Sequence, residues 1–251
     1  MLLAAPAAHA KELVAYYEAS WASLPAATMI LSLGDDGAAY RDRLHIETVG
    51  VPRWLIHFRA HIDAAGTFSA DGKPTPARYG LDYDLRRFRN QHVRVNFVAR
   101  DGNLIAERTV DDSSNKPPLP EIYRRNIIDP VTAFAVMREH LLHHRVAAGD
   151  HFTLPVFDDV RRFDIAVSVV SIDPIAKLIH LHLDLIAIAG FKDKKADNHD
   201  PEDAPRPIEL TFRDDADMMP QRLEVAVGWL PLVIRFDHRC ADATHCDTPA
   251  R

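Results

Sequence analysis

The stretch WLIHFRAHID, residues 54–63, alternates two kinds of side chain from one residue to the next. Such alternation is typical of a strand with one buried face, because successive side chains of a strand point to opposite faces of the sheet. The apolar face carries Trp54, Ile56, Phe58, Ala60 and Ile62, and the other face carries Leu55, His57, Arg59, His61 and Asp63. The stretch therefore predicts a half-buried strand of an antiparallel sheet.

The same signal extends in both directions along the chain. From residue 12 to about residue 110, strand-like segments alternate with Asp-Gly turns, which are strong hairpin signals. These turns lie in LGDDG (33–37), ADGKP (70–74) and RDGN (100–103). Beyond residue 150 further strand-like segments follow, among them AKLIHLHLDLIAIAGF (176–191). The chain is therefore predicted to be mainly β, with roughly ten antiparallel strands.

One segment, IDPVTAFAVMREHLLHHRVAAGD (128–150), predicts a helix instead. Asp129 suits the N-cap position, and Pro130 suits the first helical position, where its missing N–H costs nothing. The helix is expected at about 130–145, with an apolar stripe that packs on the sheet. The stripe comprises Val131, Phe134, Met137, Leu141 and Ala148, whereas Thr132, Glu139 and His143 fall on the opposite side.

A single helix is too narrow to cover such a sheet. Ten strands at about 4.8 Å spacing form a sheet roughly 45–50 Å wide, whereas a helix is only about 10 Å across. The remaining apolar surface would be too large to leave in water. We therefore predict one β-rich domain, residues 11–251, whose large antiparallel sheet curves into a barrel or half-barrel with the helix packing on it. Such a sheet is suited to enclose an apolar ligand, although side chains can also fill its interior completely.

The bulk composition argues against several function classes. A net charge of −6 disfavours a nucleic-acid-binding protein, which needs a basic face to displace counterions. No apolar run reaches the roughly 18–20 residues of a membrane-spanning helix. The sequence also contains neither a glycine-rich phosphate loop nor a G-x-S-x-G nucleophile motif. We therefore expect no cofactor and no catalytic residue, and the sequence favours a protein that is not an enzyme.

Both ends of the chain carry signs of export. Ala8-His9-Ala10 has the small-x-small form of a signal-peptidase site, so residues 1–10 are interpreted as the remnant of a signal peptide. The alternative is an alanine-rich N-terminus without fixed structure. Cys240 and Cys246 lie close together and would form a disulfide in an exported protein. A Cys/His metal clip that includes His245, or two free thiols, are the alternatives. These features predict an exported protein.

Histidine is the residue type that most suggests chemistry, with 14 copies. The segment HLHLD places His180 and His182 on one strand face, and His57 and His61 share the polar face of residues 54–63. If the two strands were neighbours, the four imidazoles could bind a divalent transition metal. The alternative is that these histidines simply occupy the solvent-facing side of the sheet.

Segments of the second half of the chain resemble a known family. DPVTAFAVMR followed by AGDHFTLPVFDDVRRFDIAVSVV resembles a bacterial exported family catalogued as domain of unknown function 3108. The matching positions are a D-P-x-[ST]-A helix start at 129–133 and a G-x-x-[FY]-x-[LI]-P-V-F-D segment at 149–158. The later segment LTFRDDADMMPQRLEVAVGWLPLVIRF is similar to the family's strand-turn-strand ending, except that Asp217 and Met218 stand where basic residues are common. The resemblance implies an exported, mainly β protein without an established activity, and it therefore predicts a location in the periplasm of a Gram-negative bacterium. A fold-level analogy suggests periplasmic carriers of lipids and lipoproteins.

Three hypotheses on function follow from these features. The first is non-catalytic binding of a hydrophobic small molecule or lipid in the concave face of the curved sheet. The second is a metal-binding protein or metal-dependent enzyme that uses His57, His61, His180 and His182. The third is an envelope scaffold that docks a protein partner through a sheet edge. The oligomeric state is not indicated. The residues expected to bind the apolar ligand are Trp54, Ile56, Phe58, Phe134, Met137, Leu141, Ile234 and Phe236.

Overall fold

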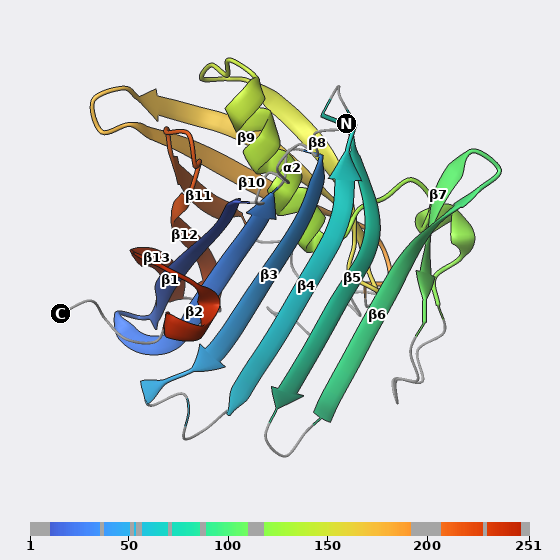
Figure 1. The fold of residues 1–251 in the computed structure, drawn as a ribbon, viewed down its shortest axis with the longest axis horizontal. Helices are drawn as coiled ribbons and strands as arrows, with labels where there is room; N and C mark the ends of the chain where they lie inside the picture. Colours follow the sequence, from blue (N-terminus) through green and yellow to red (C-terminus); the bar gives the residue numbers. More distant parts are fainter. Residues whose placement is uncertain are drawn as a thin grey trace, which may run out of the picture.

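The computed structural model describes residues 11–35, 38–50, 53, 57–69, 72–85, 89–109, 118–191, 207–227 and 230–246. The strands in these ranges form one 13-stranded antiparallel sheet, against which the helix α2 packs (Figure 1). The prediction of a mainly β chain with a curved antiparallel sheet and one conspicuous helix is therefore confirmed.

The segment predicted as a signal-peptide remnant (1–10) and the predicted ligand-binding residues Trp54 and Ile56 lie outside the described residues. The elements are β1 (Lys11–Trp21), β2 (Leu24–Asp35), β3 (Ala39–Thr48), β4 (Phe58–Phe68), β5 (Pro74–Leu85), β6 (Arg89–Arg100), β7 (Asn103–Arg108), η1 (Glu121–Tyr123), α2 (Pro130–His143), β8 (His151–Phe157), β9 (Arg162–Asp173), β10 (Leu178–Ala189), β11 (Ile208–Arg213), β12 (Pro220–Val227), β13 (Leu230–Cys240) and η2 (Ala243–His245).

The first and last strands are neighbours in the middle of the sheet. β1 pairs with β2 on one side and with β13 on the other. From β1 the chain runs strand by strand to one edge at β7, crosses to the other edge at β8, and returns strand by strand to β13. Each step within these two runs is an antiparallel pair, which a short turn can connect. This topology explains why turn signals recur along most of the sequence.

Local structure follows the sequence signals closely. Asp101 and Gly102 have φ values of 50° and 75°, as a two-residue type I′ hairpin requires between β6 and β7. In β4, Ala60 and Ala64 are buried whereas His61 is exposed. The predicted alternation is thus confirmed over the described part of residues 54–63.

The crossing segment 124–128 makes backbone hydrogen bonds to both edge strands. The Asn126 N–H donates to the Leu104 carbonyl of β7 at 2.7 Å, and the Ile128 N–H donates to the Pro155 carbonyl of β8 at 2.9 Å. An open sheet edge otherwise presents unpaired N–H and C=O groups. The segment therefore bridges the half-barrel, although β7 and β8 do not pair with each other.

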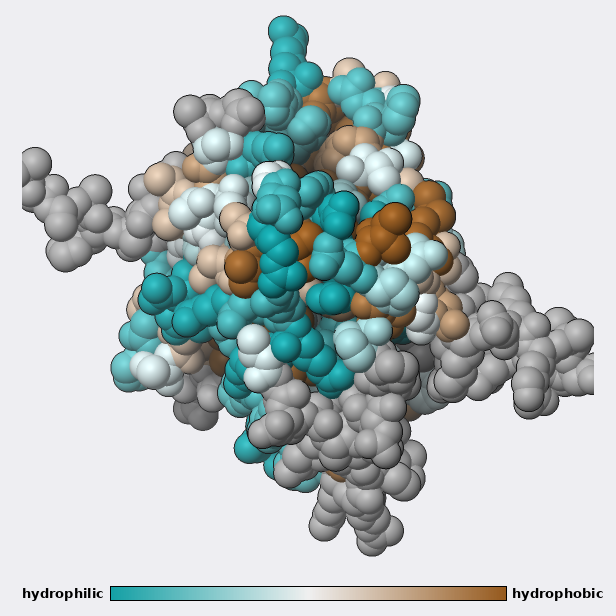
Figure 2. All heavy atoms as spheres, turned by 90° about the vertical axis from the view of Figure 1, so that its right-hand side faces the viewer, coloured by the Kyte–Doolittle hydropathy of each residue, from teal (hydrophilic) through white to brown (hydrophobic). Residues whose placement is uncertain are grey.

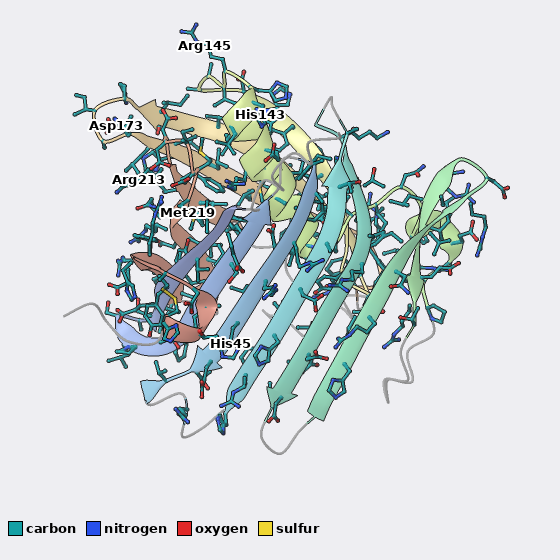
Figure 3. All side chains as sticks on the ribbon, in the orientation of Figure 1. His45, His143, Arg145, Asp173, Arg213 and Met219 are labelled. Carbon is teal, nitrogen blue, oxygen red and sulfur yellow. A yellow bond between two sulfur atoms is a disulfide. The ribbon has the colours of Figure 1, made fainter. Side chains whose placement is uncertain are left out.

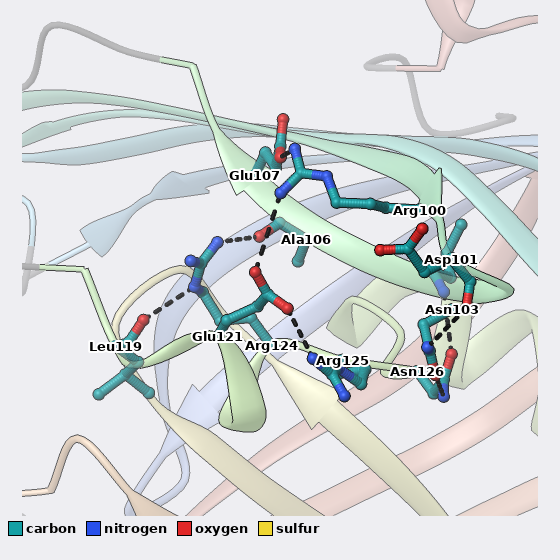
Figure 4. Close-up of polar contacts among 11 residues, drawn as sticks. Arg100, Asp101, Asn103, Ala106, Glu107, Leu119, Glu121, Arg124, Arg125 and Asn126 are labelled. Atoms are coloured by element: carbon teal, nitrogen blue, oxygen red, sulfur yellow. Dashed lines mark hydrogen bonds and ion pairs between the residues drawn. The ribbon is translucent and has the colours of Figure 1, made fainter.

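Side chains fasten this segment to the end of the sheet at β7 (Figure 4). The Arg124 guanidinium donates to the Leu119 carbonyl at 2.8 Å and to the Ala106 carbonyl at 2.5 Å. The Asn126 side-chain oxygen accepts the Leu104 N–H at 2.9 Å. The surface on this side of the molecule is mainly hydrophilic, with separate hydrophobic groups between the polar ones (Figure 2). The polar contacts therefore add to the apolar packing of this edge, where Ala106 and Ile127 belong to one buried cluster.

A buried ion pair also connects the two edges. Arg108 Nε, at the end of β7, lies 3.1 Å from Asp159 Oδ1, in the turn that follows β8. The two side chains are only 17% and 2% exposed. Because the pair is so little exposed to solvent, removal of one partner would leave the charge of the other buried without compensation. The contribution of this pair to stability therefore requires both residues.

Helix α2 lies against the concave face of the sheet and joins the two halves of the core. Met137 and Leu141 pack with Leu181 and other buried residues of β8–β11. Ala135 belongs to a cluster with residues of β3–β6, and Phe134 also contacts the cluster of β1 and β2. The helix ends at His143, slightly before the predicted end at about 145. The prediction that the helix packs on the curved sheet is confirmed.

The side of α2 predicted to be polar is partly buried. Thr132 belongs to that predicted polar side, yet its side chain is 0% exposed. Its hydroxyl donates to Asp129 Oδ2 at 2.5 Å and lies 2.7 Å from the Tyr40 hydroxyl on β3. Because the curved sheet surrounds the first helical turn, a polar side chain there is buried and its hydrogen bonds are made within the protein.

Cys240 and Cys246 form a disulfide, with their Cα atoms 5.1 Å apart. The bridge joins the end of β13 to the residue after η2. Cys246 is fully buried in a cluster with Val14 and Ile30, whose side chains lie on the outer face of the sheet, opposite α2. The disulfide therefore holds the turn 243–246 against that outer face.

None of the described helices is long and apolar enough to cross a membrane.

Candidate ligand-binding cavity

A cavity of about 250 Å³ lies between the concave face of the sheet and the first turns of α2. Strands from both halves of the sheet contribute to it, β1–β5 on one side and β11–β13 on the other. The lining is almost wholly apolar. It consists of Tyr17, Met29, Leu31, Leu44, Ile62, Tyr79, Pro130, Val131, Phe134, Leu210, Pro220, Arg222, Leu223 and Ile234.

The period-2 alternation of the strands explains why the lining is apolar. Met29 and Leu31 are two residues apart in β2, so both point to the concave face. On α2, Val131 and Phe134 are three residues apart and share one side of the helix. A cavity lined by such side chains stays dry and binds apolar molecules.

Three of the described lining residues carry polar groups, and none of the three offers an unpaired charge to the cavity. The Tyr17 hydroxyl donates to the Pro220 carbonyl at 3.1 Å. Burial raises the pKa of Tyr17 and of Tyr79 well above the ordinary tyrosine value, so both phenols stay neutral. Arg222 donates to Glu224 Oε2 at 2.5 Å. The cavity is therefore suited to an uncharged apolar group.

A buried polar network fixes the helix turn that covers the cavity. The Asp129 side chain is fully buried, and its Oδ1 accepts the N–H groups of Val131 at 2.9 Å and of Thr132 at 2.8 Å. Burial raises the pKa of Asp129 from 3.8 to about 6, although its hydrogen bonds act in the opposite direction. The sequence predicts this N-cap, and the structure adds that the cap is enclosed by the sheet. The position of Val131 and Phe134 thus depends on Asp129.

The structure separates the residues predicted to bind the apolar ligand into two groups. Phe134 and Ile234 line the cavity. The others for which the structure describes side chains pack elsewhere in the core. Met137 and Leu141 lie in the cluster of β8–β11, Phe236 meets the Tyr17 ring edge-on at 5.7 Å, and the Phe58 ring lies 6.2 Å from that of Tyr83.

The four histidines predicted as a metal site lie on separate parts of the sheet. His61 is on β4 and His57 directly precedes it, whereas His180 and His182 are on β10; β3, β2, β1, β13, β12 and β11 lie between these two strands. The condition for a shared site, adjacent strands, is therefore not met. His180 contacts Thr211 at 3.1 Å, and His182 pairs with Glu209 at 2.6 Å. Within the described ranges, no group of three or more His, Cys, Asp or Glu side chains is arranged to hold a metal ion.

Most of the strand residues that line the cavity are not among those predicted from the sequence to bind the ligand. The signal was present, since Met29, Leu31 and Leu44 occupy the apolar positions of their strands. What the sequence did not indicate is which strands face each other across α2. The cavity joins β2 and β3 to β11 and β12, more than 160 residues away along the chain.

Together, the fold and the cavity define a β protein in which a helix encloses an apolar cavity within a half-barrel. The family model described as "Protein of unknown function (DUF3108)" matches residues 16–229, so the chain belongs to this family. The fold is similar to that in the crystal structure of a beta-barrel-like protein of the domain of unknown function DUF1849 from Brucella abortus. The two are 12% identical, with a TM-score of 0.56 over 91% of this chain and 96% of that chain, and this likeness concerns the fold alone. A search of curated proteins finds no match.

The structure explains the roles of the residues in the helix-start motif at 129–133. Asp129 caps the helix, Pro130 occupies its first position, and Thr132 closes the hydrogen bonds of the buried cap. Ala133 is 0% exposed, so a larger side chain has no room there. In the other matched segment, Gly149 has a φ of 94°, which favours glycine. The motif residues are thus those that fix α2 inside the sheet.

Proposed function

We propose that this protein binds a hydrophobic or lipid-like molecule, without catalysing a reaction, in the cavity between α2 and the concave face of the sheet. The observation that carries the proposal is the apolar cavity of about 250 Å³ lined by Phe134, Leu31 and Ile234. Burial of apolar groups in such a site contributes about 0.8 kcal/mol for each CH₂ removed from water. The absence of a free charge in the lining favours an uncharged apolar group over a polar one.

The size of the cavity limits the ligand. Sites for drug-sized ligands occupy roughly 300–1,000 Å³, and the volume here, about 250 Å³, is slightly smaller. The proposed ligand is therefore a short acyl chain or a single ring system, or the end of a longer lipid whose remainder lies outside the cavity. Shape rather than hydrogen bonding would select it.

We also propose that the protein acts in the periplasm. The Cys240–Cys246 disulfide supports this proposal, because disulfides persist in oxidising compartments. The Ala8-His9-Ala10 sequence, with the form of a signal-peptidase site, supports it independently. Cell fractionation with a tagged full-length protein tests it, and recovery in the cytoplasmic fraction would contradict it.

Binding can be tested with uncharged n-alcohols of increasing length, measured by isothermal titration calorimetry on the purified chain. Affinity is expected to rise with each added CH₂ until the cavity is full, and then to stop rising. Ile234→Trp fills the cavity from β13 and should abolish binding. Ile186→Trp is the matched control, since Ile186 is 47% exposed on β10 and outside the cavity lining.

The midpoint of urea denaturation of both variants must equal that of the wild type within error. Lost binding then reflects a filled cavity and not unfolding. Should Ile234→Trp prove unstable, Leu31→Ala provides a second test, because a larger cavity should shift the preferred alcohol to a longer chain. If no alcohol binds to the wild-type protein, or if both tryptophan variants bind equally well, the proposed ligand site is wrong.

A further inference from the structure

The outer face of β2–β5, opposite α2, carries a groove of about 640 Å³ that is unlike the apolar cavity. We call it the outer groove. Its lining includes Ser32, Arg41, Arg43, His45, His61 and Arg78. Figure 3 labels His45 on β3, within this part of the sheet. The groove is therefore polar and rich in cationic side chains.

Strand alternation places these side chains together. Arg41, Arg43 and His45 are two residues apart along β3, so all three point to the outer face. Cross-strand pairing sets His45 opposite His61 and Arg43 opposite Asp63. The turn η2, held by the Cys240–Cys246 disulfide, contributes Ala243 to the lining. A surface that would otherwise be flat thereby gains a wall.

The charges in the groove do not cancel. Among the residues that the structure describes, Asp63 is the only acidic one in the lining, and its Oδ2 lies 3.8 Å from Arg78 Nε. Arg41 and Arg43 are exposed and pair with no carboxylate among the described residues. Three arginines and one aspartate leave a net charge of +2 with neutral imidazoles, on a chain whose total is −6. A concentrated positive field on an acidic protein attracts anions.

The groove also holds hydrogen-bonding groups at its base. The Ser32 side chain is only 3% exposed, and within the described ranges its hydroxyl has no hydrogen-bond partner. His45 Nδ1 and His61 Nδ1 lie 3.1 Å apart, with their rings stacked at 4.2 Å. Two imidazoles so placed could hold a cation, but the three arginines around them would repel it. The same arginines and hydroxyl suit an oxyanion.

From this juxtaposition we propose that the outer groove binds a phosphate group carried by a larger molecule. A phosphate carries roughly −1.5 to −2 charges at neutral pH and three acceptor oxygens, which match the uncompensated charge and the donors of the groove. Guanidinium groups bind phosphate through paired N–H donors, so Arg41 and Arg43 are the principal contacts. The Ser32 hydroxyl donates a further hydrogen bond. This site goes beyond the proposed apolar ligand and lies on the opposite face of the sheet.

Calorimetry with the purified full chain tests the site. The probes are glycerol 3-phosphate, as a soluble phosphate ester, and vesicles of phosphatidylglycerol, with phosphatidylcholine vesicles for comparison. The Arg41→Gln/Arg43→Gln variant should weaken binding at least about tenfold, which corresponds to about 1.4 kcal/mol. The Arg213→Gln/Arg235→Gln variant removes the same charge from exposed positions outside the groove and should change binding less than about twofold.

The two probes distinguish the source of the phosphate. Binding of glycerol 3-phosphate without preference for phosphatidylglycerol vesicles supports a soluble phosphorylated ligand, and binding of both supports a lipid headgroup. If neither probe binds, or if the two double variants weaken binding equally, the site is refuted. The n-alcohols of the cavity test are uncharged, so the outcomes at the two sites are independent.

Discussion

Replacement of Asp129 by asparagine should change the dependence of stability on pH. The carboxyl group is fully buried at the start of α2, and burial raises its pKa from 3.8 to about 6. The asparagine side chain keeps an oxygen for the N–H groups of Val131 and Thr132 but cannot ionise. The variant therefore keeps the hydrogen bonds of the N-cap and removes only the free-energy cost of the buried charge.

The magnitude follows from the two pKa values. Below about pH 3, Asp129 is protonated in both the folded and the unfolded chain, and its full contribution to stability is present. As the pH rises to about 6, the unfolded chain releases the proton while the folded protein still holds it, so stability is lost. A tenfold change in a proton equilibrium is about 1.4 kcal/mol, so the loss is about 3 kcal/mol above pH 6.

Urea denaturation from pH 4 to pH 8, followed by circular dichroism, measures this loss. The free energy of unfolding of Asp129→Asn, relative to the wild type, should increase by roughly 2–2.5 kcal/mol between pH 4 and pH 7, because part of the full loss has already occurred at pH 4. The control is Asp173→Asn, since Asp173 (labelled in Figure 3) also accepts two backbone N–H groups, in the β9–β10 turn. If the difference between Asp129→Asn and the wild type is the same at pH 4 and pH 7, the reasoning about the buried cap is wrong.

Other predictions concern the closure of the half-barrel and its outer face. Arg108→Met and Asp159→Asn should each lower the free energy of unfolding by about 3 kcal/mol, because each single change leaves one charge buried without its partner. The double variant should lose much less, which a double-mutant cycle in urea measures. Losses that simply add would contradict this prediction. Replacement of both Cys240 and Cys246 by alanine should cost about 2 kcal/mol, since the bridge closes a short loop, and unchanged stability under oxidising conditions would contradict the disulfide's role. Gly66→Ala should lower the free energy of unfolding by roughly 1–3 kcal/mol. The added Cβ would lie only 2.6 Å from the Thr75 carbonyl oxygen and would also meet the Tyr40 hydroxyl. A variant as stable as the wild type would contradict this, since it would show that β4 can move away from these two groups.

The sequence predicts the local structure of this protein well. Alternation in residues 54–63 and in HLHLD identifies which side chains face inward, and Ile179 and Leu181 are indeed buried. The Asp-Gly signal identifies the hairpin at 101–102, and Asp129-Pro130 identifies the start of α2. These features depend on neighbours along the chain, so their signals are contained in short windows.

The parts that the sequence does not predict depend on contacts between distant segments. The pairing of β1 with β13 sets Val14 opposite Cys240, and no local pattern specifies that partnership. For the same reason His61 is adjacent to His45 rather than to His180, so the strand adjacency on which the metal-site hypothesis depended is not present. The burial of Thr132 likewise follows from the curvature of the sheet around α2 and not from the helix itself.

The cavity and the outer groove differ in how far the sequence indicates them. Phe134 and Ile234 were expected to meet an apolar ligand, and both line the cavity. No sequence pattern distinguishes Arg41, Arg43 and Ser32, since exposed arginines on a strand are common in proteins. Only the pairing of β2, β3 and β4 and the position of η2 bring them into one groove.

Native mass spectrometry of the protein, isolated from its own cell envelope without denaturation, tests the central claim most directly. We expect the wild-type chain to carry one small apolar molecule, which is released on unfolding. We expect Ile234→Trp to carry none and Ile186→Trp to carry it still. A wild-type chain at its bare mass, with the cavity remaining empty when short n-alcohols are added, would contradict it.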